Sequence, residues 1–330
     1  CELLLLLADL KADKISMSKE QICAISMSKR NEYMNKTARL KPLQSGMRKA
    51  KPYLFILPSM LFFAVFAIYP LIYIIVLSFF DRSIIGDMTF VGFENFIKLF
   101  NNPEFGPIMK NTVVYMVIVV LLTTVFSMLV ALLLQRPTRL NKIVQQIAFS
   151  PYVISTVSVV FVWMWMMDAD YGLFNYIIDW FGLGEVNWVT DPNVTIFSIA
   201  IVSVWKSLGY NAIIIIAALN AIPKHYYEAA KLDNSSSVKT YFRITLPMIS
   251  PTVFFLVLIN IIGALKNFET INLMTAGKFD TTTLVYFVYQ NAREYFDFGY
   301  ASSAGVILMV FIAIITLLYF KVLAKKVYYR

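Results

Sequence analysis

The sequence has very few residues suited to redox, metal or acid–base chemistry. Of its 330 residues, two are cysteines, Cys1 and Cys23, and one is a histidine, His225. Both cysteines lie in the polar N-terminal region, so no disulfide framework and no metal-ligand spacing are available. A single histidine is far more often structural than catalytic. The sequence therefore indicates no catalytic residue, no metal site and no cofactor.

Charged residues are also scarce. They make up 15% of the chain, whereas hydrophobic residues reach 59% and the mean hydropathy is +0.67. A soluble domain carries about a quarter charged residues, because its surface must stay hydrated. Most of this chain's surface is therefore expected to face lipid or other apolar surface, which predicts an all-α membrane protein.

Long apolar segments are abundant. A bilayer core of ~30 Å requires about 20 apolar residues in a helix. Pro58 and Pro70 in the first segment are compatible with a membrane helix, where neighbouring groups satisfy the freed carbonyls. Charge occurs within two segments, as Lys206 in the fourth and as Lys266 and Glu269 in the fifth. The six predicted spans are residues 53–80, 111–134, 145–167, 194–220, 251–276 and 301–320.

The positions of Lys and Arg predict the direction of each span. Cytoplasmic loops of membrane proteins carry an excess of these residues. Nineteen lie in segments 29–51, 135–144, 221–250 and 321–330, against five in the alternate segments. Segment 168–193 has none and carries five acidic residues. We therefore expect both termini in the cytoplasm. The net charge of +9 serves orientation and contact with anionic lipid rather than nucleic-acid binding.

The ends of the chain contribute little to this prediction. Residues 1–50 are expected to form a cytoplasmic basic tail. Residues 1–30 of that tail are interpreted as an over-extended start, with Met27 or Met34 as alternative beginnings. The six-span domain is predicted to cover residues 51–325, with a short cytoplasmic tail at 326–330.

The connection at residues 221–247 has the pattern of a helical hairpin. Pro223 suits the first turn of a helix, where its missing N–H is not needed. The turn signal Asp233-Asn234-Ser235 combines tolerance of a left-handed conformation with helix-capping side chains. A second short helix is expected at about residues 236–244. The hairpin is interpreted either as an amphipathic surface element or as a docking element for a cytoplasmic partner.

The same hairpin resembles a known motif. Glu228-Ala229-Ala230, then Asp233, then Ile244-Thr245-Leu246-Pro247 is similar to the EAA loop of ABC importer permeases. In that family the loop couples the permease to its ATPase. The resemblance implies coupling roles for Glu228, Ala229, Ala230, Asp233 and Asn234. Asn234 stands where the family usually has glycine, and asparagine is the next most permissive residue for positive φ.

Other motifs extend the resemblance over about residues 50–325 and towards carbohydrate permeases of the maltose, multiple-sugar and glycerol-phosphate type. The motifs are Val91–Phe96 with Asn111-Thr112, Trp205 with Gly209-Tyr210-Asn211, Phe268-Glu269 with Met274–Gly277, and Phe298–Ala304. The family commonly has Gly-Gly-Pro where this chain has Ala276-Gly277-Lys278, so that external turn is altered.

This likeness implies a type I ABC importer permease fold in a prokaryotic cell membrane. It also implies three kinds of partner: a homologous second permease (a heterodimer), two ATPase subunits and an extracytoplasmic solute-binding protein. The sequence lacks the phosphate-binding loop G-x-x-x-x-G-K-[ST], so we expect ATP hydrolysis on another chain. The alternative is a stand-alone secondary transporter or channel with six spans.

Polar residues within the fourth and fifth spans are candidates for a substrate pathway. A charge at the bilayer centre costs about 2.5–3.5 kcal/mol on insertion scales, so it should face the bundle interior or water. Lys206, Lys266 and Glu269 therefore either neutralise one another, with Lys266 and Glu269 spaced i, i+3, or line the pathway. Each uncharged polar candidate is either a contact between helices or a ligand contact. The full candidate set is Trp205, Lys206, Tyr210, Asn211, Asn260, Asn267, Glu269 and Asn272.

Overall fold

The computed structural model describes residues 24, 27–29, 31–32, 53, 55–82, 88–182 and 184–323. Most of the predicted N-terminal tail and all of the predicted tail 326–330 lie outside the described residues. The chain divides into two units, residues 1–71 and 72–330.

The first apolar segment forms a helix over Phe55–Leu77. It includes a π-helical turn, η1 (Ala64–Ile68), followed by α3 (Tyr69–Leu77). Pro70 lies just after the π turn. Proline has no N–H and its ring clashes with the carbonyl four residues earlier, and a wider turn accommodates both effects. The Tyr69 N–H accordingly bonds to the Ala64 carbonyl five residues back.

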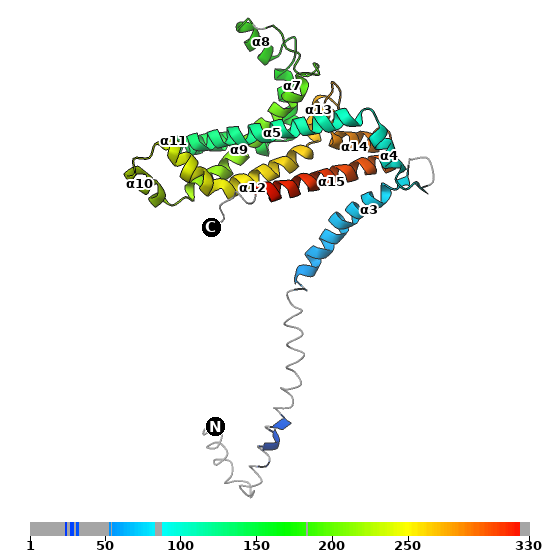
Figure 1. The fold of residues 1–330 in the computed structure, drawn as a ribbon, viewed down its shortest axis with the longest axis horizontal. Helices are drawn as coiled ribbons and strands as arrows, with labels where there is room; N and C mark the ends of the chain where they lie inside the picture. Colours follow the sequence, from blue (N-terminus) through cyan, green and yellow to red (C-terminus); the bar gives the residue numbers. More distant parts are fainter. Residues whose placement is uncertain are drawn as a thin grey trace, which may run out of the picture. The chain divides into compact units, whose positions relative to one another are not determined.

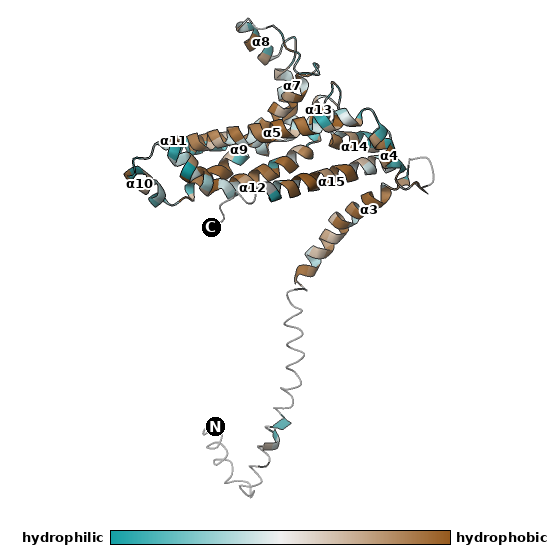
Figure 2. Cartoon of the chain, in the orientation of Figure 1, coloured by the Kyte–Doolittle hydropathy of each residue, from teal (hydrophilic) through white to brown (hydrophobic). Residues whose placement is uncertain are grey.

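In the second unit, long apolar helices form a bundle. Its members α5 (Phe105–Leu134), α9 (Thr195–Asn220), α12 (Leu246–Leu265) and α15 (Phe298–Leu323) run alongside one another (Figure 1). Figure 2 shows hydrophobic residues along most of their length. Within the described part of the chain, five helices are long and apolar enough to cross a membrane, and a bent pair makes a sixth crossing if it counts as one span.

The bent pair corrects the predicted third span. Residues 145–167 do not form one helix, because α6 (Arg139–Val153) and α7 (Thr156–Met166) meet at 101°. Between them, Ile154 is extended and Ser155 is also non-helical. Pro151 lies three residues before the break and supplies no N–H to the last turn of α6. In Figure 1, α7 and the short helix α8 (Leu173–Trp180) extend away from the bundle.

The predicted fifth span also differs from the structure. Its helical segment runs from Ser237 to Leu265 rather than over residues 251–276. Lys266 and Asn267 interrupt it, and a separate helix α13 (Glu269–Met274) follows. Lys266 and Glu269 therefore lie at a helix break and not inside a continuous span. α14 (Leu284–Arg293) then leads towards α15.

A serine directly precedes a proline at two places in the described helices. Pro151 in α6 cannot donate to the Ile147 carbonyl, and the Ser150 hydroxyl donates to that oxygen instead, at 2.9 Å. Pro251 in α12 leaves the Pro247 carbonyl in the same position, and the Ser250 hydroxyl donates to it at 2.7 Å. Each proline is thus accommodated without an unsatisfied carbonyl in apolar surroundings.

Small and polar residues hold α9 against its neighbours. On the α5 side, the Thr123 and Ser207 hydroxyls lie 3.3 Å apart, and the Ser127 hydroxyl donates to the Leu208 carbonyl at 3.0 Å. On the α6 side, a Cβ added at Gly209 would lie 1.8 Å from the Ala148 carbonyl oxygen. Glycine is therefore required for the two backbones to approach this closely.

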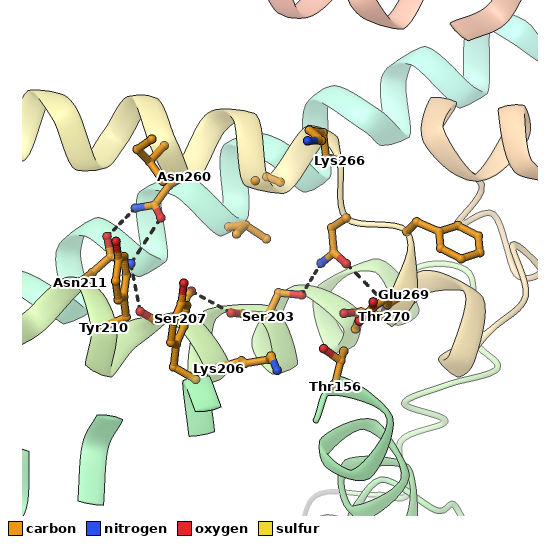
Figure 3. Close-up of a pocket in the computed structure, with 17 residues that line it drawn as sticks. Thr156, Ser203, Lys206, Ser207, Tyr210, Asn211, Asn260, Lys266, Glu269 and Thr270 are labelled. Atoms are coloured by element: carbon orange, nitrogen blue, oxygen red, sulfur yellow. Dashed lines mark hydrogen bonds between the residues drawn. The ribbon is translucent and has the colours of Figure 1, made fainter. Parts of the chain in front are cut away.

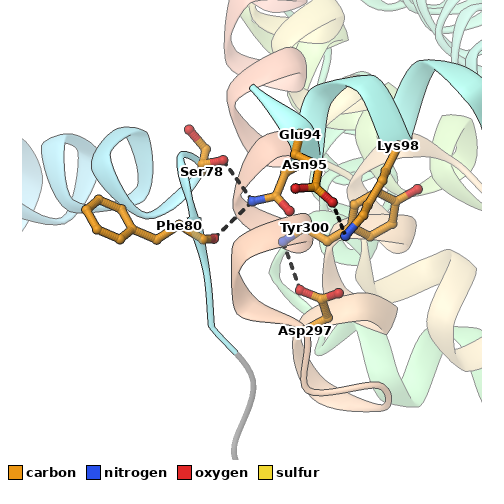
Figure 4. A network of polar contacts seen from close by, with 7 residues as sticks. All are labelled: Ser78, Phe80, Glu94, Asn95, Lys98, Asp297 and Tyr300. Atoms are coloured by element: carbon orange, nitrogen blue, oxygen red, sulfur yellow. Dashed lines mark hydrogen bonds and ion pairs between the residues drawn. The ribbon is translucent and has the colours of Figure 1, made fainter. Parts of the chain in front are cut away.

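Short elements pack at one end of the bundle. They are α4 (Glu94–Asn101) and the paired two-residue strands β1 (Phe80–Asp81) and β2 (Thr89–Phe90), a small departure from an all-helical structure. Asn95 on α4 donates to the carbonyls of Ser78 and Phe80 (Figure 4).

At the same end, Asn111 on α5 donates to the Asp280 carbonyl at 2.8 Å, and the Thr112 hydroxyl accepts from the Leu284 N–H. The Asn111-Thr112 motif thus anchors the turn before α14. In that turn Ala276 and Gly277 both have positive φ.

Candidate functional site

A cavity of about 480 Å³, lined by many polar residues, lies where α5, α9 and α12 meet the two helix breaks (Figure 3). The end of α6 and the start of α7 supply one part of its wall, and the segment between α12 and α13 supplies another. The lining residues are Val119, Tyr152, Thr156, Ser203, Lys206, Ser207, Tyr210, Asn211, Ile259, Asn260, Gly263, Ala264, Lys266, Asn267, Phe268, Glu269 and Thr270.

Two asparagines bridge α9 and α12 along the cavity. Asn211 donates to the Asn260 side-chain oxygen at 3.3 Å, and Asn260 donates back to the Asn211 oxygen at 3.0 Å (Figure 3). Asn211 is buried and also donates to the Ser207 carbonyl within α9. The pair therefore works as a helix contact and leaves some amide capacity facing the cavity.

A third asparagine joins the α12–α13 break to the bundle. The Asn267 amide donates to the Tyr115 hydroxyl on α5 and, at 3.0 Å, to the Ser203 hydroxyl on α9. Tyr115 is fully buried and lies 2.7 Å from Ser203. This network fixes the segment that follows Leu265. The Asn267 side chain thereby joins the break to α5 and α9.

Aromatic and charged groups complete the cavity. The Tyr152 and Tyr210 rings stack with centroids 4.4 Å apart and an interplanar angle of 12°. The Lys206 ammonium donates to the Ile154 carbonyl at 2.8 Å. Lys266 and Glu269 are exposed, and within the described residues no ion pair joins them. The cavity therefore offers amides, two ammonium groups, a carboxylate and a flat aromatic surface.

Most of the pathway residues predicted from the sequence come together in this cavity. Lys206, Tyr210, Asn211, Asn260, Asn267 and Glu269 all line it. Two predicted residues do not. Trp205 lies beside an apolar cleft on the α7 side, with its ring 5.5 Å from that of Trp163, and Asn272 lies on α13 away from the lining.

Sequence reasoning missed the residues that reach the cavity from the broken third span and from the small-residue face of α9. They are Tyr152, Thr156, Ser203 and Ser207. The spacing of Ser203 and Ser207, four residues apart on one helix face with Asn211, was a usable signal. Tyr152 and Thr156 gave no comparable signal, because their place depends on the bend.

The predicted hairpin lies at the end of the bundle opposite α4 and α14 (Figure 1). Its first helix is α10 (Lys224–Leu232), preceded by Pro223. Asn234 has φ 49°, so the left-handed turn expected at this residue is present. Ser236 caps α11 (Ser237–Thr240) by accepting from the Lys239 N–H. The second helix does not stop at residue 244, because a π turn, η2 (Tyr241–Thr245), carries it directly into α12.

The residues with implied coupling roles differ in exposure. Glu228, Ala229, Asp233 and Asn234 are exposed, whereas Ala230 is buried. The Ala230 carbonyl accepts from the Ser235 N–H at 2.9 Å, which closes the turn. Behind the hairpin, the Tyr227 hydroxyl lies 3.1 Å from that of Thr245. α10 is therefore fixed against the start of α12, with Glu228 and Ala229 on its free surface.

Comparison with known proteins assigns this architecture. The family model described as the binding-protein-dependent transport system inner membrane component matches residues 114–328. The chain belongs to this family. It is an inner-membrane permease of an ABC importer, a class that works with a binding protein and a separate ATPase. Because the chain belongs to this family, the alternative of a stand-alone secondary transporter or channel is excluded.

Several curated permeases are similar over most of their length. The sn-glycerol-3-phosphate transport system permease of Pectobacterium atrosepticum is 30% identical, covering 84% of this chain and 96% of the relative. The arabinooligosaccharides transport system permease of Halalkalibacterium halodurans is 32% identical, covering 84% and 90%. The trehalose/maltose transport system permease of Thermococcus litoralis is 31% identical, covering 87% and 97%.

The fold of the permease matches solved ABC importers. A chain from the bacterial alginate ABC transporter, in complex with an alginate pentasaccharide-bound periplasmic protein, superposes with a TM-score of 0.75 at 25% identity. It covers 84% of this chain and 95% of the solved chain. A second structure of an importer for the acidic polysaccharide alginate gives a TM-score of 0.73 at 26% identity. The predicted type I permease fold is confirmed.

Proposed function

We propose that this permease moves a carbohydrate into the cytoplasm through the cavity between α5, α9 and α12. Sugars present hydroxyl groups and apolar ring faces, so their sites combine amides and carboxylates with aromatic surfaces. Asn260 and Glu269 supply the polar part of such a site, and the stacked pair Tyr152–Tyr210 supplies the aromatic part. The names of the relatives, which are glycerol-phosphate, arabino-oligosaccharide and trehalose/maltose permeases, support the carbohydrate class.

The observation that carries this proposal is the meeting of two helix breaks at one polar cavity. Transport proteins place substrate sites where membrane helices are discontinuous, because the freed backbone groups there face a cavity rather than lipid. The α6–α7 break contributes Thr156 to the lining, and the α12–α13 break contributes Asn267 and Thr270.

A second, homologous permease is proposed to cover the open side of this cavity as a heterodimer partner. Lys266 and Glu269 are exposed in the single chain, and charges at membrane depth require a protein or water-filled environment. Two ATPase subunits are proposed to bind on the side of α10. The solute-binding protein is proposed to dock at the opposite end, near α4 and α14.

Transport kinetics test the cavity. The complex is reconstituted in proteoliposomes with its solute-binding protein, and the probe is the saccharide that this binding protein binds most tightly in a screen of mono- and oligosaccharides. Asn260→Ala and Glu269→Gln are expected to raise the KM for uptake about tenfold, because a hydrogen bond to a polar substrate is worth ~1–2 kcal/mol. Asn272→Ala is the matched control outside the cavity. Unchanged KM and rate in both cavity variants would contradict the assignment.

A coupling role is proposed for the exposed surface of α10 around Glu228 and Ala229. Glu228→Lys is expected to abolish co-purification of the ATPase and substrate-stimulated ATP hydrolysis, because it reverses a charge at the centre of that surface. Glu104→Lys makes the same exchange at an exposed position at the other end of the bundle, and it serves as the control for co-purification of the ATPase. Persistence of both ATPase binding and uptake in Glu228→Lys would refute this role.

A further inference from the structure

The break between α6 and α7 leaves helix-end groups beside the cavity. Ile154 and Ser155 are not helical, so the carbonyls at the end of α6 lose the helical donors that would satisfy them. The Lys206 ammonium on α9 donates to the Ile154 carbonyl at 2.8 Å. A cation suits this position, because the C-terminal end of a helix carries partial negative charge.

One face of α9 holds the end of α6 at three neighbouring points. Gly209 allows backbone contact at Ala148, and Tyr210 stacks on Tyr152 at 4.4 Å. Lys206 reaches the break itself. Residues 206, 209 and 210 follow the i, i+3, i+4 spacing of a single helix face. The close contact at Gly209 therefore sets the register that brings the lysine to Ile154.

Lys206 also belongs to the cavity lining. In Figure 3 its side chain extends towards Thr156, in the first turn of α7. An ammonium group has three N–H donors, and the bond to Ile154 uses one of them. The remaining donors are available to an oxygen atom of a molecule in the cavity. The same ammonium can therefore contact both the helix break and the substrate.

We propose that Lys206 is a positioning residue that links occupancy of the cavity to the angle between α6 and α7. Its bond to the Ile154 carbonyl restricts the angle between α6 and α7. A substrate hydroxyl or acidic oxygen that binds the same ammonium changes the range of angles that these two helices adopt. The link to bound substrate, the second half of the proposal, rests on the proposed transport function. The restriction of the angle by Lys206, the first half, concerns the permease without substrate.

Distance measurements between spin labels test the first half without substrate. Cys1 and Cys23 are replaced by serine, and labels are placed at Ile147 on α6 and Phe161 on α7, both of which are exposed. The assembled complex is measured in lipid nanodiscs. Lys206→Met is expected to broaden the distance distribution, because the Ile154 carbonyl loses its donor. Lys206→Arg, which keeps charge and donors, is expected to restore the narrow distribution.

Lys266→Met is the matched control, since it removes an ammonium from the same cavity but not from the break between α6 and α7. It is expected to leave the label distribution narrow. Lys206→Leu provides a second variant without donors if Lys206→Met does not assemble. A wild-type distribution in either of these variants would overturn the proposal.

Uptake and substrate-dependent label distances test the second half. The saccharide bound most tightly by the solute-binding protein is the probe. It is expected to shift the distances in the wild type but not in Lys206→Met, and the variant is expected to raise the KM at least about tenfold, as for a lost charge-assisted hydrogen bond. A shift that survives in Lys206→Met would contradict the link. If no saccharide is transported, the proposed function fails, while the substrate-free distances still decide the role of Lys206 at the break.

Discussion

Single side chains decide how closely the helices of this permease approach one another. At Gly209 the nearest atoms to an added Cβ are backbone atoms of Ala148 and Phe149, which cannot rotate away. Gly209→Ala is expected to lower the unfolding free energy by about 1–3 kcal/mol, as overpacking does. Gly263→Ala is the matched control, because nothing lies within 4 Å of its added Cβ. Thermal unfolding of both variants in detergent measures the difference, and equal melting temperatures would argue against the close contact.

The sequence predicted local conformation better than it predicted contacts between distant residues. The left-handed turn at Asn234 followed from the sequence, because asparagine tolerates positive φ and its neighbours are capping residues. The sequence also shows that Asn211 and Asn260 are polar residues within apolar segments. Their reciprocal hydrogen bonds, however, join positions 49 residues apart. Asn111 is an extreme case, since its role depends on the Asp280 carbonyl 169 residues away. No local pattern specifies such contacts.

At the scale of elements, the serine–proline pairs make α6 and α12 possible as helices. Ser150→Ala is expected to destabilise the permease by about 1–3 kcal/mol, because the Ile147 carbonyl is left without a donor. Ser150→Ala combined with Pro151→Ala is expected to recover much of this loss, because residue 151 regains its N–H. A double-mutant cycle of unfolding free energies checks the coupling. Strictly additive effects would show that the hydroxyl bond does not compensate for the proline.

Helix breaks were the elements that the sequence predicted worst. Hydropathy reports that a segment is apolar but not that it bends, so residues 145–167 were expected to form one span and form two helices at 101°. Composition did carry a weak signal, since Pro151 lies just before the break and Ser155 lies in it. In the fifth span the charges of Lys266 and Glu269 marked the end of the helix rather than a pair within it. The fourth span, apolar and free of proline, was predicted to within one residue.

For the whole molecule, the distribution of basic residues predicts which loops face the cytoplasm. In a background without Cys1 and Cys23, a cysteine at Pro137, in the basic loop 135–144, is expected to react with a membrane-impermeant maleimide only after the membrane is opened. A cysteine at Asp170 is expected to react in intact cells, because segment 168–193 has no Lys or Arg. The reverse pattern would invert the proposed ATPase and binding-protein sides together.

The close contact at Gly209 also limits how the permease can move. A point where two backbones touch behaves as a pivot. The helices can tilt about it, but sliding α9 along its axis would bring a larger side chain of the same face, such as Lys206 or Ala212, towards the Ala148 backbone. Tilting moves the two ends of α6 in opposite directions relative to α9. A widening on one side of the membrane then comes with a narrowing on the other, which is the geometric requirement for a gate that is never open at both ends.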